Sequence, residues 1–141
     1  RSSKAKGRHS FLASRARRVF IETKIREVAK KFGVSIYRIA IVGNHIHLLL
    51  RVTSRRGFIS FLRAITGIIA RIIMGAERGR AQLSGSHARQ EKDRFWDQRP
   101  WARVIAWMRD FANVKKYVKQ NFNEAMGFVP YKPRKKYSST A

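Results

Sequence analysis

Two histidines and an asparagine before them are the residues whose types and spacing most clearly suggest chemistry. They lie in the run Asn44-His45-Ile46-His47-Leu48, where one residue separates the histidines. On a β-strand, residues two apart point to the same face, so the two imidazoles would lie side by side. Neutral imidazoles are good ligands for a divalent cation. The alternative is a pair of half-exposed strand histidines without a ligand, which a short isolated motif favours.

A second candidate set lies near the C-terminal end, in Tyr117-Val-Lys-Gln120-Asn121. Tyr117 and Asn121 are four residues apart and would share one face of a helix. That face is turned by about 100° from the apolar stripe of the same helix, so both side chains would reach the edge of a helix–sheet interface. Asn121 would then add a metal ligand to the histidines. Taken alone, Tyr117 would be a boundary residue and Asn121 a solvated one.

The charge of the chain indicates its partner. Its 141 residues suit one domain, and 32 Lys plus Arg against 8 Asp plus Glu give a net charge of +24. A compact domain with this charge repels itself unless it binds a polyanion. There is no cysteine, which excludes disulfides and thiolate metal sites. We see neither a signal peptide nor an apolar run of about 18 residues or more, so we expect nucleic acid and no membrane as partner. Charge alone also fits a ribosomal-type or chromatin-type binder.

Hydrophobic periodicity predicts an α+β domain. The predicted elements are a basic arm (1–10), a helix (about 14–32), two strands around Gly43-Asn44 (34–42 and 45–52), a helix (about 54–74), a polar loop (75–94), one or two short strands (95–107) and a last helix (about 109–124). We expect one domain over 1–129 and a basic flexible tail over 130–141. A ferredoxin-like antiparallel sheet covered by helices needs a further strand before the first helix. None is visible after Arg1, so this N-terminal strand is expected to be missing.

Three segments resemble the HUH single-tyrosine transposases in the order in which that family has them. Ile41–Leu50 resembles the HUH segment, in which His-hydrophobic-His follows Asn. Phe95–Ile105 resembles the Trp-containing stretch of the REP-associated tyrosine transposases, and Tyr117–Asn121 resembles the catalytic Tyr with an amide ligand four residues later. Together they cover roughly residues 30 to 128. Many relatives have Gln where this chain has Asn121, so Gln120, one residue early, is an alternative ligand.

The resemblance implies a metal-dependent transposase of insertion-sequence type that nicks and rejoins single-stranded DNA. Tyr117 would attack a phosphodiester and form a 5′-phosphotyrosine intermediate. His45, His47 and Asn121 would hold Mg²⁺ or Mn²⁺, with the histidine motif on a central strand and Tyr117 on the C-terminal helix. The substrate would be single-stranded or hairpin DNA. The residues expected to contact it are Lys4, Lys6, Arg8, Arg15, Arg18, Trp96, Arg99 and Trp101.

Several points stay open at this stage. Exposed aromatic residues would stack on bases, whereas core packing is favoured for Phe95 and Trp107; His9 and His87 are expected to be solvated. No general base is assigned. A replication-initiator or relaxase-like nickase, a catalytically idle DNA-binding protein derived from a transposase and a basic RNA-binding module are the alternatives. Both a monomer and a homodimer fit, and we expect a cytoplasmic, nucleoid-associated bacterial protein.

Overall fold

The computed structural model describes residues 1–75 and 95–133. Within these ranges the chain forms a short 3₁₀ helix, three α-helices and two strands. In order they are η1 (Gly7–His9), α1 (Arg15–Lys31), β1 (Val34–Val42), β2 (His45–Val52), α2 (Arg55–Met74) and α3 (Arg109–Ala125). Most of the predicted polar loop, His87 and the end of the predicted tail lie outside the described residues.

Local signals in the sequence determine where the first two long helices begin and end. The Ser14 hydroxyl accepts a hydrogen bond from the backbone N–H of Arg17 at 3.1 Å, and Ser54 caps α2 in the same way through Gly57 at 3.0 Å. Each bond satisfies one of the N–H groups that a helix start leaves open. Gly33 and Gly75 follow the helices with φ of +66°, a conformation that costs glycine little. The predicted helix boundaries are confirmed to within one residue.

The two strands form an antiparallel hairpin whose register places the histidines. Val42 pairs with His45 and Ala40 with His47. The pairing is irregular between Ile36 and Arg38, so that Tyr37 has no partner in the ladder. An extra residue of this kind is a β-bulge, which bends the strand and can re-aim its side chains.

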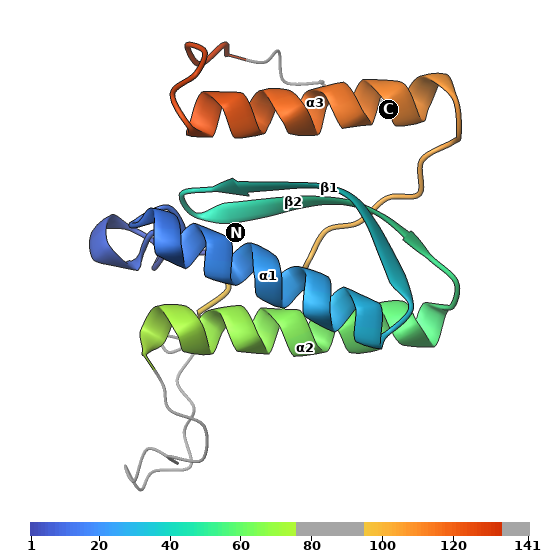
Figure 1. The fold of residues 1–141 in the computed structure, drawn as a ribbon, viewed down its shortest axis with the longest axis horizontal. Coiled ribbons are helices and arrows are strands. Elements are labelled where there is room, and N and C mark those ends of the chain that lie inside the picture. The colour runs from blue at the N-terminus through green and yellow to red at the C-terminus, as the bar shows by residue number, and fades with distance from the viewer. Residues whose placement is uncertain (76–94, 134–141) are drawn as a thin grey trace, which may run out of the picture.

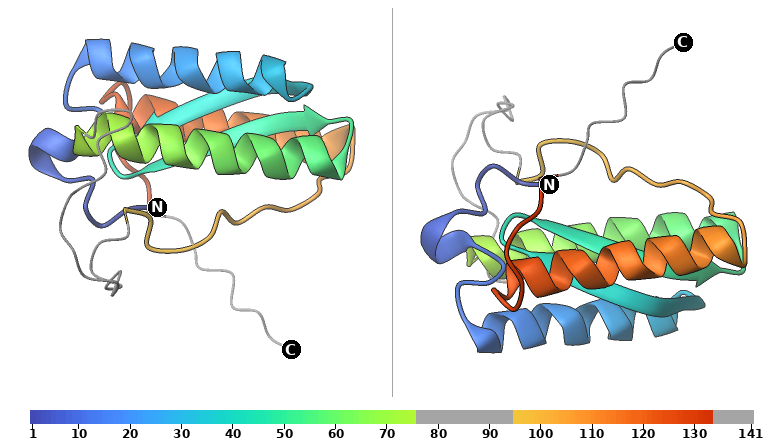
Figure 2. Two further views of the ribbon diagram at one scale, coloured as in Figure 1. Left: turned by 90° about the horizontal axis from the view of Figure 1, so that it is seen from below. Right: turned by 90° about the horizontal axis from the view of Figure 1, so that it is seen from above.

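Helices cover both faces of the hairpin. Figure 1 shows α1 and α2 on one face and α3 on the other, and both views of Figure 2 agree. The main core lies between the hairpin, α1 and α2, where Ile21, Ile25 and Phe61 have no exposed surface. The predicted α+β class is confirmed. Among the described residues the sheet has two strands, so a central strand and the full ferredoxin-like arrangement are not observed.

The prediction of strands over 95–107 is wrong. This segment has no strand and no helix, and it carries the highly exposed side chains of Trp101 (82%) and Val104 (97%). Its richness in aromatic residues suggested strands, but a strand is stable only when its backbone groups pair with a neighbour. In the described part of the chain, this segment makes one backbone hydrogen bond to the N-terminal arm, from the Asp97 N–H to the Arg1 carbonyl at 3.1 Å, and no strand pairs with it.

The N-terminal arm is more ordered than a loop that only lies along phosphates. Ser2 is fully buried; its N–H donates to the Asn44 carbonyl at 2.9 Å, and its hydroxyl donates to the Phe95 carbonyl. Phe11, also fully buried, donates its N–H to the Gly43 carbonyl at 2.9 Å. The arm therefore closes over the Gly43-Asn44 turn, beside the histidine motif.

Helix α2 is the one described helix that is long and apolar enough to cross a membrane. A core helix passes the same test. In α2, the residues buried in the main core are Phe61, Ile65, Ile69 and Ile73. Packing in the core therefore accounts for part of the apolar composition of α2, because 22% of its most apolar stretch is buried.

Replacing Phe61 by Ala should lower the free energy of unfolding by about 3–5 kcal/mol, because it removes a fully buried ring and leaves a cavity. Ile59→Ala, on the exposed side of the same helix (37% exposed), should change it by less than about 0.5 kcal/mol. Urea unfolding followed by circular dichroism measures both. Equal losses in the two variants would contradict the assignment of the core.

Asp97 should make stability depend on pH. Its carboxylate accepts hydrogen bonds from the N–H and the hydroxyl of Ser3, each at 2.8 Å, and the backbone bond first, then the hydroxyl, lowers the pKa of Asp97 below its ordinary 3.8. A depressed folded-state pKa stabilises the fold above the ordinary value, and this contribution is lost as pH falls through the folded pKa. Melting temperatures should therefore favour the wild type over Asp97→Asn at neutral pH and converge in acid. A difference that grows on acidification would contradict the assignment.

Candidate active site

His45 and His47 lie side by side on the face of the hairpin that α3 covers. Their ring centroids are 4.7 Å apart and their planes meet at 86°. The residue opposite His47 on β1 is Ala40, which is fully buried. Its single methyl group occupies little volume below α3, where a longer side chain would compete with the imidazole. The predicted shared face of the two histidines is confirmed.

Asn44 orients the first histidine. Its side-chain oxygen lies 2.8 Å from Nδ1 of His45. In the tautomer in which Nδ1 donates this hydrogen bond, Nε2 carries the lone pair and is available to a metal ion. Metal-binding histidines usually have such a partner on their second nitrogen. The sequence places Asn44 next to the histidines but does not indicate what its side chain does. The contact with Nδ1 of His45 indicates that it orients the ring.

The surroundings of His45 favour its neutral form. Burial lowers the pKa of His45 below its ordinary 6.5, and the positive charge of the Arg1 side chain lowers it further. Burial disfavours the charged imidazolium, and like charges nearby do the same. A neutral imidazole is the form that coordinates a cation, so this shift keeps His45 ready to bind a metal near neutral pH.

Helix α3 brings Tyr117 to the histidines. The rings of His47 and Tyr117 are 5.8 Å apart, edge to face at 82°. Tyr117 is 41% exposed, so part of its ring is accessible to a substrate, whereas Val118 beside it is buried. Three rings from two elements far apart in the sequence therefore meet, as predicted for the histidines and the last helix.

Asn121 and Gln120 differ in where their amides are used. Asn121 is buried (6% exposed), and its Nδ2 donates to the Tyr117 carbonyl at 2.9 Å. This bond uses the amide nitrogen, and the amide oxygen is the atom suited to a cation. Gln120 instead donates through Nε2 to Glu124 at 2.8 Å, along the same helix. Of the two residues, Asn121 is the buried one, and its role and that of Gln120 as metal ligands stay predictions.

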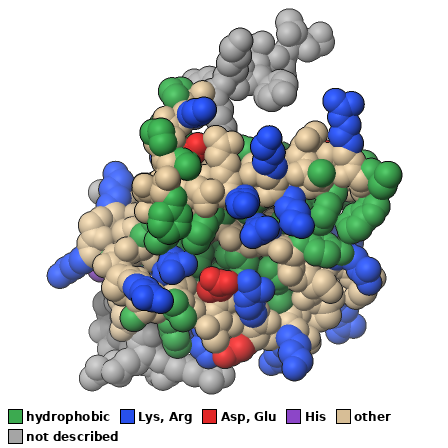
Figure 3. Space-filling view, turned by 45° about the horizontal axis from the view of Figure 1, so that its top comes forward, with side chains coloured by type: hydrophobic (Ala, Val, Ile, Leu, Met, Phe, Trp, Pro, Cys, Tyr) green, Lys and Arg blue, Asp and Glu red, His purple; other side chains and the backbone are tan. Residues whose placement is uncertain are grey.

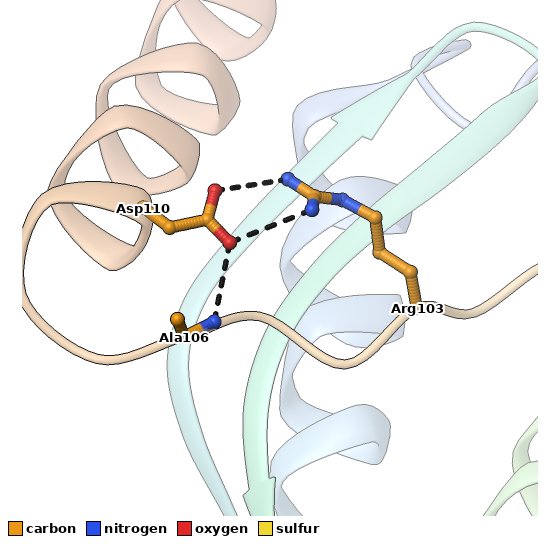
Figure 4. A network of polar contacts seen from close by, with 3 residues as sticks. All are labelled: Arg103, Ala106 and Asp110. Atoms are coloured by element: carbon orange, nitrogen blue, oxygen red, sulfur yellow. Dashed lines mark hydrogen bonds and ion pairs between the residues drawn. The ribbon is translucent and has the colours of Figure 1, made fainter.

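A polar network fixes the start of α3. Figure 4 shows the carboxylate of Asp110 facing the Arg103 guanidinium and the Ala106 backbone N–H, both at 3.2 Å. Asp110 is in the first turn of α3, where a negative charge also interacts favourably with the helix dipole. Met108, just before α3, has φ of +76°, a conformation that strains a residue with a side chain.

The described residues contain no group of three or more His, Cys, Asp or Glu that could hold a metal. A metal here would therefore depend on two imidazole nitrogens and an amide oxygen. His45, in its neutral form with an oriented Nε2, fits this donor set, and the buried position of Asn121 one helical turn beyond Tyr117 agrees with it. Such mixed nitrogen and oxygen donors suit Mn²⁺ and, less selectively, Mg²⁺.

Most predicted DNA contacts lie on the surface. Lys6, Arg8, Arg15, Arg99 and Trp101 are exposed, whereas Lys4 and Arg18 are half-buried. The Arg18 guanidinium lies 5.8 Å from the centre of the Phe122 ring and links α1 to α3. In Figure 3, Lys and Arg side chains spread over the face that includes α3, and acidic side chains are few. This distribution suits a polyanion.

Two aromatic or histidine predictions need correction, and a third residue has contacts that the sequence did not indicate. Trp96 is half-buried: it packs against Phe11, with ring centres 5.8 Å apart, and its Nε1–H donates to the Thr66 carbonyl at 3.0 Å. Its predicted base contact stays a prediction. Phe95 is buried as predicted, but core packing was the wrong prediction for Trp107, which is 64% exposed. His9 is half-buried rather than solvated, with Nδ1 3.2 Å from the Ile73 carbonyl.

Comparison with known proteins identifies the family. The family described as "Transposase IS200 like" matches residues 4–121, which include both candidate histidines, Tyr117 and Asn121. The chain belongs to the IS200-like transposase family. No curated protein and no solved structure matches it significantly. Family membership assigns a transposase that acts on DNA, and it agrees with the resemblance seen in the sequence.

For this transposase, added Mn²⁺ should raise the melting temperature, because a ligand that binds only the folded state stabilises it. His47→Ala removes one donor and should weaken Mn²⁺ binding by at least about tenfold, or about 1.4 kcal/mol. His9→Gln, which removes an imidazole near the end of α2, is the control and should bind like the wild type. Calorimetric titration gives the affinities. Unchanged binding by His47→Ala would place the metal elsewhere.

Proposed function

We propose that this transposase cuts and rejoins single-stranded DNA through Tyr117. The observation that carries the proposal is the ring contact between His47 and Tyr117, 5.8 Å between centroids. It joins a tyrosine on α3 to a histidine pair on β2, although about 70 residues separate them in the sequence. Packing alone gives no reason for an exposed tyrosine and two imidazoles to gather at one place.

The chemistry is an in-line exchange of phosphate esters. The Tyr117 oxygen attacks the scissile phosphorus, a Tyr–O–P bond forms, and the bond from phosphorus to the 3′ oxygen breaks. The tyrosine gives up its proton and the departing 3′ oxygen gains one, so the products are a 5′-phosphotyrosine and a free 3′-hydroxyl. Because one ester replaces another, the phosphodiester energy is conserved and rejoining needs no nucleotide cofactor.

A divalent cation, Mg²⁺ or Mn²⁺, would be held by His45, His47 and Asn121. When bound, it would polarise the scissile phosphate and offset the charge that develops during attack. The protein's own contribution is to keep His45 neutral and oriented, through burial and Asn44, and to hold Tyr117 beside the pair. An ordinary tyrosine has a pKa of about 10 and is a weak nucleophile at neutral pH, so the charge that develops during attack must be offset and the tyrosine must be positioned.

Family membership and charge support DNA as the substrate. The net charge of +24 favours a polyanion, and the predicted contacts Lys6, Arg8 and Arg15 are exposed for phosphate binding. Single-stranded or hairpin DNA is proposed because the sequence resembles the HUH single-tyrosine transposases, which act on such DNA. A cytoplasmic protein bound to the nucleoid fits this activity, and either a monomer or a homodimer fits it.

Tyr117→Phe should abolish formation of a covalent protein–DNA adduct while leaving DNA affinity within about twofold, because phosphate contacts elsewhere supply most of the binding. The change removes only the hydroxyl, and the ring contact with His47 is preserved. End-labelled hairpin and single-stranded DNA, incubated with Mn²⁺ or Mg²⁺ and run on a denaturing gel, shows the adduct. Tyr131→Phe, at an exposed tyrosine outside the site (70% exposed), is the matched control and should form it normally.

The position of the label identifies the polarity. A label 3′ of the cut should migrate with the protein, and a label 5′ of the cut should appear on a shortened free strand. An adduct that persists in Tyr117→Phe would assign the nucleophile to another residue. Tight DNA binding with no adduct in any variant would support a catalytically idle binding protein instead.

A further inference from the structure

The start of α3 carries a cluster of exposed aromatic rings that the proposed reaction does not use. Trp107 is 64% exposed and Tyr37 is 39% exposed. The rings of Trp107 and Phe111 are 4.5 Å apart at 34°, and Tyr37 meets Phe111 edge to face at 5.1 Å. Exposing this much aromatic surface costs free energy in water, so a cluster of this kind marks a binding surface. We call Tyr37, Trp107 and Phe111 the aromatic platform.

Two backbone irregularities present the platform. Tyr37 is the residue left without a partner by the irregular pairing of β1, and a bulge can direct its side chain to the face covered by α3. Trp107 immediately precedes Met108, whose φ of +76° is strained. The Asp110 network with Arg103 and Ala106 holds this turn in place. Strain of this kind is retained where the surrounding structure enforces it, most often at functional sites.

A positive group lies directly beside the platform. Arg38 follows Tyr37 and pairs with Leu49, so it shares the face of Ala40 and His47. Its Nε atom is buried and makes no hydrogen bond to any described residue. A buried donor without a partner costs stability, and a ligand that accepts its hydrogen bond, or one from the rest of the guanidinium, would recover it. Arg109, in the first turn of α3, is exposed and adds a second positive charge at the start of this helix.

We propose that the aromatic platform and Arg38 form a subsite for one unpaired nucleotide of the DNA strand, with the base stacked on Trp107 and the phosphate bound by Arg38. This subsite rests on the proposed function, because it requires single-stranded DNA as the substrate. Aromatic rings stack on any base, and arginine binds phosphate through several donors. Phe111 and Tyr117 are six residues apart, about 9 Å along the helix axis. The nucleotide held here is therefore close to the scissile phosphate.

The test is binding of a labelled single-stranded oligonucleotide at fixed salt, measured by fluorescence anisotropy with Tyr117→Phe as the parent protein, so that no cutting occurs. Trp107→Leu keeps apolar bulk and loses stacking, and it should weaken binding about tenfold. Trp107→Phe should recover most of the affinity. Tyr131→Leu, at an exposed tyrosine outside the platform, is the matched control and should bind like the parent.

Abasic substitutions locate the nucleotide. Removing the base at one position of the oligonucleotide should weaken binding by the parent protein, and the same abasic strand should cause no further loss in Trp107→Leu, because both changes remove one stacking contact. If the two losses multiply at every position, or if Trp107→Leu binds like the parent, the platform does not hold a base. A change in molecular mass by light scattering without a change in DNA affinity would assign it to a protein interface.

Arg38→Met separates binding from folding. If Arg38 served only the fold, its loss would lower the melting temperature and leave DNA affinity unchanged. If Arg38 binds a phosphate, its Nε is buried and unsatisfied in the DNA-free protein. Arg38→Met should then leave the melting temperature of the DNA-free protein unchanged or higher, and should lower both the DNA affinity and its dependence on salt concentration. Lower stability with unchanged affinity would overturn the role of Arg38. Adduct formation is measured separately, in proteins that retain Tyr117. A failure of the nicking proposal is therefore distinguishable from a failure of the nucleotide subsite.

Discussion

The packing of α3 across the hairpin is the contact on which the site depends. The histidines belong to a strand that is held by its own turn and by the N-terminal arm, but Tyr117 reaches them only because α3 lies on that face. Few side chains secure this contact: in α3 the buried residues are Val118 and Asn121. One of the two is also the expected metal ligand. Binding of a cation between α3 and β2 would therefore add a further link between these two elements.

Charge and burial act together on the chemistry. Burial and nearby positive charge both disfavour protonation of His45, so a strongly basic protein keeps one of its expected metal-binding histidines neutral. The same excess of Lys and Arg destabilises the compact chain through repulsion, and DNA relieves it. The basic residues thus favour DNA binding, and one of them, Arg1, also favours the neutral form of His45.

Sequence patterns predicted the helices, the hairpin and the shared face of the histidines because these depend on local rules: caps at Ser14 and Ser54, glycine at Gly33 and Gly75, and the two-residue period of a strand. They failed where distant contacts decide. The 95–107 segment is rich in aromatic residues, as strands often are, but has no partner strand among the described residues. Trp107 lies exposed at the strained turn before α3. The bulge at Tyr37 and the bond from His45 to Asn44 likewise follow from pairing and packing, which a single sequence does not encode locally.

The order of the elements along the chain also sets the order in which the site forms during synthesis. The hairpin pairs neighbouring strands through a two-residue turn, and contacts so near in sequence form quickly. Tyr117 follows His47 by about 70 residues, so at roughly 5–20 residues per second the ribosome adds it several seconds later. The histidine half of the site is therefore made, and can pair into its hairpin, before the proposed nucleophile exists. A nascent chain at that stage has no Tyr117 to attack a phosphate, so cleavage by the proposed route waits until α3 has left the ribosome.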